Sequence, residues 1–190
     1  MCRGASNEHP WFAVRVKFRH EKVVASALRG KGFHEFLPLY KSHHRSGGRI
    51  QQVELPLFPT YLFCQFDPQR PLPILTIPGV FGITGGHNAF WPVDPEQFAA
   101  VRVITASGLS CTPISQCRGG DCVYVEDGPL RGTRGVLERW KNANRLIVSV
   151  TILQRSVAVE IDHSWVRPFQ ASNGANLLYS SRNERERSFR

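Results

Sequence analysis

The chain has 190 residues, with 24 Lys or Arg against 15 Asp or Glu, so its formal net charge is +9. This length suits one ordinary domain or two small ones, and the positive charge favours an acidic partner such as nucleic acid or an anionic surface. No apolar run is long enough to span a bilayer, and the first ten residues lack the apolar core of a secretory signal. We therefore expect a cytoplasmic protein with no membrane partner.

The cysteines do not form a metal-binding pattern. There are five of them, an odd number, and no two are spaced as Cys-x-x-Cys. The three in the C-terminal half are too loosely spaced for a zinc knuckle and have no His nearby to complete one. We expect free thiols, no metal and no cofactor. The residues are Cys2, Cys64, Cys111, Cys117 and Cys122.

The first predicted elements are a strand and a helix. Residues 11–19 alternate between an apolar face and a face that becomes basic, which is typical of a half-buried strand. Residues 20–30 carry apolar side chains at helical spacing, and Gly30 and Gly32 end that helix. The apolar face of the strand comprises Phe12, Val14, Val16 and Phe18.

A basic hairpin is predicted next. Residues 33–42 form a strand signal interrupted by Pro38, and residues 50–55 form its partner. Gly47-Gly48 supplies the positive dihedral angles that a hairpin tip favours. Between residues 15 and 49 there are nine Lys or Arg and two Glu, so this stretch carries 9 − 2 = +7.

The most apolar stretch of the N-terminal half is residues 55–66. Its second part, residues 61–66, predicts a strand with at least one face in the core. The prolines before it, Pro56 and Pro59, lack the N–H that a β-ladder needs, so Leu57 and Phe58 are expected on a loop or sheet edge. We expect Phe58 to be an exposed anchor for a protein partner.

The rest of the N-terminal half completes an α+β unit. A proline-rich, irregular segment at 67–78 is followed by a short strand at 80–84. Asp94 is a predicted N-cap, and Pro95 suits the first position of the helix that follows it. The predicted order is β-α-β-β-β-α with a largely antiparallel sheet.

The C-terminal half has a different pattern. Four short strand signals separated by turns predict a small β-barrel, and residues 165–166 could add a fifth strand. The four signals are residues 122–125, 134–138, 146–150 and 157–161. We expect a flexible N-terminus (1–10), a first domain (11–106), a linker (107–117), the barrel (118–169) and a disordered tail (170–190).

Two stretches resemble a known family. Residues 58–63 (Phe-Pro-Thr-Tyr-Leu-Phe), followed by residues 77–86, resemble the signature of the N-terminal (NGN) domain of NusG-family transcription elongation factors. Residues 120–132, followed by Gly135-Val136, resemble the KOW motif of the same family. The match runs in the right order from about residue 11 to residue 166. It implies an NGN-type antiparallel sheet flanked by helices, followed by an SH3-like barrel.

The resemblance implies a factor without chemistry of its own. Such factors bind the clamp helices of the largest RNA polymerase subunit and suppress pausing or termination, while the barrel recruits a small-subunit ribosomal protein or termination factor Rho. We expect a monomer. The residues that match the polymerase-facing surface are Trp11, Phe58, Pro59 and Tyr61, and those that match the barrel's exposed contacts are Leu130 and Leu153.

One departure from the family pattern suggests a specialised role. Thr60 stands where housekeeping members usually have Gly, and the first strand and hairpin tip are more basic than such members need. Both features resemble specialised paralogues of the RfaH type, which contact the non-template DNA strand. Binding of this kind would depend on salt. The candidate DNA contacts are Lys17, Arg19, His20 and Lys22, together with Arg45 and Arg49 at the hairpin tip.

Other interpretations remain open at this point. Trp11 and Tyr61 could be core residues, the basic cluster could be a solvated face, and Leu130 could be folded back onto the barrel. A ribosome-associated or RNA-binding structural protein is the alternative function. An enzyme is not expected, since the consecutive residues Asp162, His163 and Ser164 should point apart at a strand end and no phosphate-binding loop is present.

Overall fold

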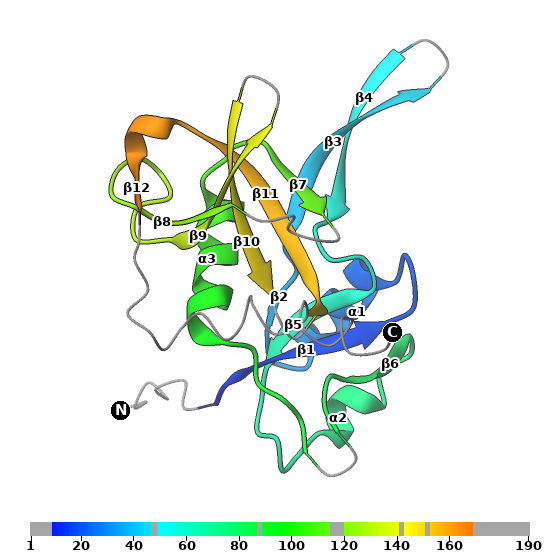
Figure 1. Cartoon of the computed structure of the whole chain (residues 1–190). Coiled ribbons are helices and arrows are strands. Elements are labelled where there is room, and N and C mark those ends of the chain that lie inside the picture. The colour runs from blue at the N-terminus through cyan, green and yellow to red at the C-terminus, as the bar shows by residue number, and fades with distance from the viewer. Residues whose placement is uncertain are drawn as a thin grey trace, which may run out of the picture.

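The N-terminal half is built on a four-stranded antiparallel sheet with strand order β2-β5-β1-β6 (Figure 1). The computed structural model describes residues 9–46, 49–86, 89–114, 120–140, 143–150 and 153–168, and the structural statements below concern those residues. The strands are β1 (Trp11–Val16), β2 (His34–Phe36), β5 (Tyr61–Gln65) and β6 (Val80–Ile83).

Helices α1 (Glu21–Gly30) and α2 (Leu72–Leu75) cover one face of this sheet. The alternation along β1 sends Phe12, Val14 and Val16 to that face, where they are buried. The strand and the helix predicted from the periodicity are therefore confirmed. Phe18 is an exception, because β1 ends at Val16 and the ring of Phe18 lies outside the sheet, 62% exposed.

Helix α3 (Pro95–Ala106) covers the opposite face at one end of β1. Asp94 caps it as predicted, since its carboxylate accepts a hydrogen bond from the N–H of Gln97 at 2.9 Å. The ring of Phe98 stacks on Trp11 with 4.4 Å between ring centroids and meets Phe63 edge to face at 5.5 Å. These contacts fix the helix against the sheet.

A two-stranded hairpin projects away from the rest of the N-terminal half (Figure 1). Its strands are β3 (Leu39–Ser46) and β4 (Arg49–Pro56), paired from Leu39 opposite Pro56 to Ser46 opposite Arg49. The predicted interruption at Pro38 is confirmed, because β2 ends before it and β3 begins after it. The Gly47-Gly48 tip lies outside the described residues.

The C-terminal half is β-rich, with one six-stranded antiparallel sheet of order β12-β8-β9-β10-β11-β7. Within the range expected to be a linker, residues 111–114 form β7, which pairs with β11 and extends this sheet. The strands are β7 (Cys111–Ile114), β8 (Asp121–Val125), β9 (Arg134–Trp140), β10 (Ala143–Val150), β11 (Arg155–Ile161) and β12 (Val166–Pro168). The expected tail at 170–190 and most of the expected flexible N-terminus lie outside the described residues.

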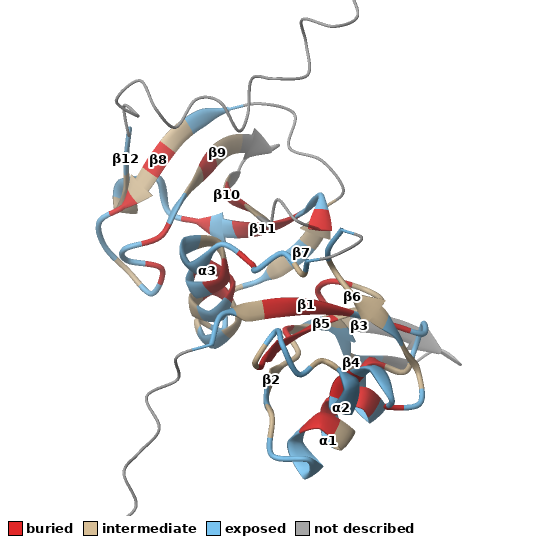
Figure 2. Cartoon of the chain, turned by 90° about the horizontal axis from the view of Figure 1, so that it is seen from below, coloured by how far each residue is buried: buried red, intermediate tan, exposed pale blue. Residues whose placement is uncertain are grey.

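The two halves share an apolar core, with α3 lying between them (Figure 2). α3 packs against β10, and Phe98 and Val101 belong to the same buried cluster as Leu146 and Val148. At the surface of this contact, a guanidinium nitrogen of Arg134 forms an ion pair with a carboxylate oxygen of Glu96 at 3.5 Å. The α+β fold class predicted from the sequence is confirmed. No helix in the described ranges combines the length and apolar character needed to cross a membrane.

Candidate functional site

The loop before β5 does not present Phe58 to solvent. Leu57 and Phe58 are both fully buried, and the ring of Phe58 meets Phe63 edge to face at 5.8 Å. The prediction that Phe58 is an exposed anchor is therefore wrong. The prolines do keep this segment out of a regular ladder, but Leu57 N–H donates to the carbonyl of Pro38 and Tyr61 N–H to that of Phe58, and these bonds hold a turn that buries the ring. Pro59 and Tyr61 remain half-buried.

Tyr61 packs against the same apolar cluster as Phe63 and Phe98, at the other end of β1 from Trp11. In the β1–β5 register it stands opposite Arg15, whereas Trp11 stands opposite Gln65 at the other end. The guanidinium of Arg15 lies 5.9 Å from the ring centroid of Phe81, which is 65% exposed. The structure thus separates Trp11 from Tyr61 by the length of β1.

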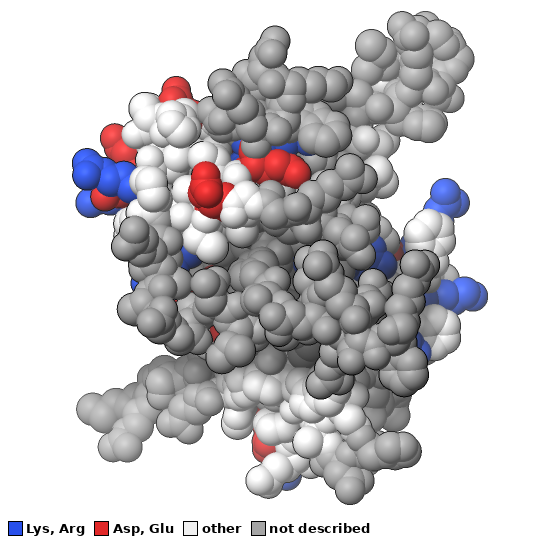
Figure 3. Space-filling model, in the orientation of Figure 1, with Lys and Arg blue, Asp and Glu red and all other residues white. Residues whose placement is uncertain are grey.

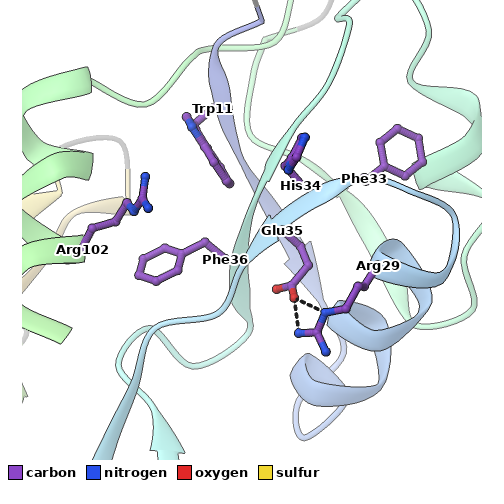
Figure 4. Close-up of a pocket in the computed structure, with 7 residues that line it drawn as sticks. All are labelled: Trp11, Arg29, Phe33, His34, Glu35, Phe36 and Arg102. Atoms are coloured by element: carbon purple, nitrogen blue, oxygen red, sulfur yellow. Dashed lines mark hydrogen bonds and ion pairs between the residues drawn. The ribbon is translucent and has the colours of Figure 1, made fainter. Parts of the chain in front are cut away.

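Trp11 lines a shallow pocket of about 340 Å³ at the edge of the sheet (Figure 4). Phe36 and Arg102 lie on the same side of β2 as Trp11, and Glu35 points to the other side. There the carboxylate of Glu35 accepts hydrogen bonds from the guanidinium of Arg29, with Arg29 Nε at 3.0 Å. The lining combines three aromatic rings, those of Trp11, Phe33 and Phe36, with two arginines, one of which is paired with Glu35. Sequence patterns do not reveal this pocket, because its residues come from four separate elements.

The predicted basic cluster forms one surface with β6, which we call the basic junction (residues 15–22 and 79–82). Lys17, Arg19 and Lys22 are exposed, and His20 is half-buried beside Gly79. Lys17 N–H donates to the carbonyl of Gly79 at 2.8 Å, which joins the two segments. Figure 3 shows Lys and Arg side chains projecting from the right-hand edge, where Figure 1 draws β6 and the turn after β1.

Two aromatic residues of the basic junction, Phe18 and Phe81, are exposed although the sequence does not predict it. The alternation of β1 predicts an inward-facing Phe18, and Phe81 stands out only as part of the family signature. Their exposure follows from the end of β1 at Val16 and from a register shift between Arg15 and Val16, neither of which periodicity reveals.

The hairpin arginines are not brought to the basic junction. Arg45 lies in β3 and Arg49 in β4, in the part of the hairpin next to its tip, and the hairpin points away from the sheet (Figure 1). Their side chains lie outside the description. The structure therefore divides the predicted nucleic-acid contacts into two separate groups.

The two leucines predicted as exposed contacts of the barrel are buried. Leu130 is fully buried in the turn between β8 and β9, where its carbonyl accepts a hydrogen bond from Thr133 N–H at 3.1 Å. Leu153 is also buried and belongs to the same apolar cluster. The expectation of exposure is wrong for both, because the turn folds Leu130 back into the core that the barrel shares with α3.

Within the described part of the chain, no three His, Cys, Asp or Glu side chains gather as a metal site. Cys64, Cys111 and Cys122 are free, while Cys2 and Cys117 lie outside the described residues. Asp162 and Ser164 do not point apart as expected: the Asp162 carboxylate accepts hydrogen bonds from the N–H and the hydroxyl of Ser164, which caps a short 3₁₀ turn. These bonds lower the pKa of Asp162.

Comparison with known proteins identifies the family. Residues 9–102 match the family described as "Transcription termination factor nusG". The transcription termination/antitermination protein NusG of Thermus thermophilus is 30% identical over 179 residues, which covers 82% of this chain and 96% of that protein. The protein of the same name from Escherichia coli K12 is 32% identical over 171 residues, which covers 82% of this chain and 94% of that protein.

A solved structure shares the fold. The structure titled "Domain interaction in Thermotoga maritima NusG" matches with a TM-score of 0.53 and 18% identity, and the match covers 86% of this chain and 98% of that one. The resemblance stated from residues 58–63, 77–86 and 120–136 is thereby confirmed. The chain belongs to the NusG family of transcription termination/antitermination proteins.

Proposed function

We propose that this protein binds RNA polymerase through its N-terminal domain and acts during elongation to suppress pausing and termination. Membership of the NusG family supports a role in transcription termination or antitermination. The proposed docking target is the clamp helices of the largest polymerase subunit. The protein acts as a binding module rather than an enzyme, and the cytoplasm is its proposed compartment.

The observation that carries this proposal is the position of Tyr61. It lies half-buried at the start of β5, at the other end of β1 from Trp11, and the residue two before it, Pro59, is also half-buried. Phe58 supports this loop from inside, because its ring packs against Phe63. A rigid, partly accessible aromatic side chain where such a loop enters a strand is the kind of anchor that contributes most to a protein interface.

The test is capture of RNA polymerase on the immobilised full-length protein. Tyr61→Ala should weaken capture at least about tenfold, as expected for loss of an interface anchor. Trp91→Ala is the matched control, because Trp91 is an exposed aromatic residue outside this loop, and it should leave capture unchanged. If the protein instead captured ribosomal subunits, and Tyr61→Ala left that capture unchanged, the result would support a ribosome-associated protein.

The regulatory effect has its own assay. On a template with a defined pause site, adding the wild-type protein should shorten the pause, and Tyr61→Ala should abolish that effect at concentrations where wild type is saturating. A longer pause in the presence of wild type would contradict the proposed antitermination role while leaving polymerase binding intact.

We further propose a specialised role in which Lys17, Arg19, His20 and Lys22 contact the non-template DNA strand. The exposure of the three Lys and Arg side chains supports this, because each can neutralise a phosphate. Arg45 and Arg49, on the separate hairpin, would contact DNA at a second position. The C-terminal domain is proposed to recruit other machinery, such as a ribosomal protein or Rho, through residues other than the buried Leu130 and Leu153.

A further inference from the structure

Two phenylalanine rings lie largely in solvent at the basic junction. Phe18 is 62% exposed and Phe81 is 65% exposed, although each is flanked in sequence by residues that are fixed in the fold. Val16 pairs with Val80, and Lys17 N–H donates to the carbonyl of Gly79 at 2.8 Å. The two rings therefore lie on either side of one hydrogen-bonded junction between neighbouring segments.

Each ring carries a cation over it. The guanidinium carbon of Arg19 lies 5.5 Å from the ring centroid of Phe18, and that of Arg15 lies 5.9 Å from the ring centroid of Phe81. Both distances fall within the range of cation–π attraction. Each ring thus has a planar, positively charged guanidinium over it. A base could stack on the ring beside that guanidinium or in its place.

The charge around the rings has one sign. Residues 15–22 and 79–82 contain four Lys or Arg and one acidic residue, Glu21, which gives 4 − 1 = +3. The carboxylate of Glu21 is buried and accepts a hydrogen bond from Thr60, so it is directed away from the surface. The exposed charges, those of Arg15, Lys17, Arg19 and Lys22, are all positive.

The backbone holds this arrangement in place. Arg19 has a φ of 64°, a left-handed value that the surrounding contacts must maintain, and Gly79 has a φ of 95°, which glycine adopts readily. A side chain at Gly79 would be strained, and its Cβ would lie 3.2 Å from His20 Cδ2. The rings are therefore presented by a defined turn rather than by a free loop.

We propose that Phe18 and Phe81 are stacking sites for unpaired bases of single-stranded DNA, with Arg15 and Arg19 closing over the stacked bases. Aromatic faces beside a positively charged track are how proteins bind single strands without reading sequence, since every base has a π-face. Bases in a duplex are already stacked on each other and cannot reach the rings. The choice of DNA over RNA rests on the proposed function, in which the exposed strand is the non-template strand.

The test uses the full-length protein and fluorescence anisotropy with a labelled oligothymidylate of about 12 nucleotides, which is within the range bound by single-strand modules. The matched probe is an abasic oligonucleotide with the same number of phosphates. Wild type should bind the oligothymidylate about 30- to 100-fold more tightly than the abasic strand, because only the oligothymidylate can stack on the two rings.

The variants separate stacking from charge. Phe18→Ala with Phe81→Ala should weaken oligothymidylate binding by about 30- to 100-fold and leave abasic binding unchanged, whereas Phe→Tyr at both positions should preserve binding. Lys17→Ala should weaken the binding of both probes equally. It should also lower the slope of log affinity against log salt by about one, the value for one phosphate contact. Trp91→Ala is the exposed aromatic control, and circular dichroism confirms that each variant is folded.

Several outcomes would overturn the inference. Equal affinity of wild type for the two probes, or no loss in the double Phe variant, would exclude stacking. Tighter binding of oligouridylate RNA or of duplex DNA than of the single strand would exclude the assigned ligand. The polymerase capture assay separates failure of the stacking sites from failure of the proposed function. If capture depends on Tyr61 but the two probes bind equally, only the stacking sites are overturned. Stacking without any capture would overturn the proposed function.

Discussion

The buried carboxylate of Glu21 accepts a hydrogen bond from the backbone N–H of Thr60 across 2.8 Å. Thr60 has a φ of 70°, and its carbonyl in turn accepts a hydrogen bond from Val16 N–H at 2.8 Å. Through Thr60, the loop of residues 57–60 is thus bonded both to α1 and to the end of β1. Because α1 also carries Lys22, these two hydrogen bonds fix Tyr61, the proposed polymerase contact, relative to the basic junction.

We expect Glu21→Ala to destabilise the fold by about 1–3 kcal/mol, because it leaves the partly buried N–H of Thr60 without a partner. Glu21→Gln should cost less, since its side-chain carbonyl can still accept the bond. Urea denaturation measures both, with the exposed Glu54→Ala as control. A Glu21→Ala protein as stable as wild type would mean that water satisfies this N–H.

Thr60→Gly should stabilise the protein or leave its stability unchanged. A residue with a Cβ at this φ carries a strain of about 1–2 kcal/mol, which glycine removes, while the flexibility of glycine in the unfolded chain costs about 0.5–1 kcal/mol. The difference in urea midpoint between Thr60→Gly and wild type measures the balance. A clear loss of stability would indicate that the Thr60 side chain makes contacts that outweigh its backbone strain.

The sequence predicted those features that depend on neighbours along the chain. The alternation of Phe12, Val14 and Val16 and the cap at Asp94 are local signals, and the structure contains both. For Phe58, local chemistry indicated only that it lies outside a ladder. Whether its ring points outwards depends on Phe63, which approaches it only in the folded sheet.

The same distinction explains the other corrections. Leu130 lies in a turn, as its Gly-Pro surroundings predict, but its burial depends on a core shared between two halves of the chain. The exposure of Phe18 depends on where β1 stops, and element ends are the least certain part of any periodicity argument. The sequence thus located the segments that form the candidate surface, but not which of their aromatic side chains are exposed.

Phe98 should be among the most sensitive positions of the fold. It stacks on Trp11, meets Phe36 and Phe63 edge to face, and lies in the cluster that joins the two halves. Phe98→Ala should cost about 3–5 kcal/mol, the range for a buried phenylalanine. Thermal unfolding measures it, and Trp91→Ala, with a side chain 56% exposed, should stay within about 0.5 kcal/mol of wild type.

Leu130→Ala tests the burial of the barrel turn. We expect a loss of about 2–5 kcal/mol, because the side chain is fully enclosed and its removal leaves a cavity. Arg131→Ala, at the exposed neighbouring position, is the control and should be nearly neutral. An unchanged unfolding midpoint for Leu130→Ala would mean that the side chain is free in solution and available to a partner.

Cys64 gives the fold a dependence on alkaline pH. Burial, and to a lesser extent the negative charge of Glu35, raise the pKa of its thiol to about 12. In the unfolded chain a thiol ionises near pH 8.5, so the unfolded state gains stability above that pH while the native thiol stays protonated. The contribution of Cys64 is therefore fully present below the unfolded pKa and is lost as the pH rises towards the native one.

Between about pH 8 and about pH 10, this linkage should remove about 2 kcal/mol of stability from wild type that Cys64→Ala does not lose. Urea denaturation of both proteins under reducing conditions measures the difference in slope, since all other ionisable groups are common to the two proteins. Parallel pH profiles would show that the native thiol ionises in the same range as the unfolded one. In that case Cys64 would be accessible to solvent, and an exposed thiol should also react rapidly with a thiol reagent near neutral pH.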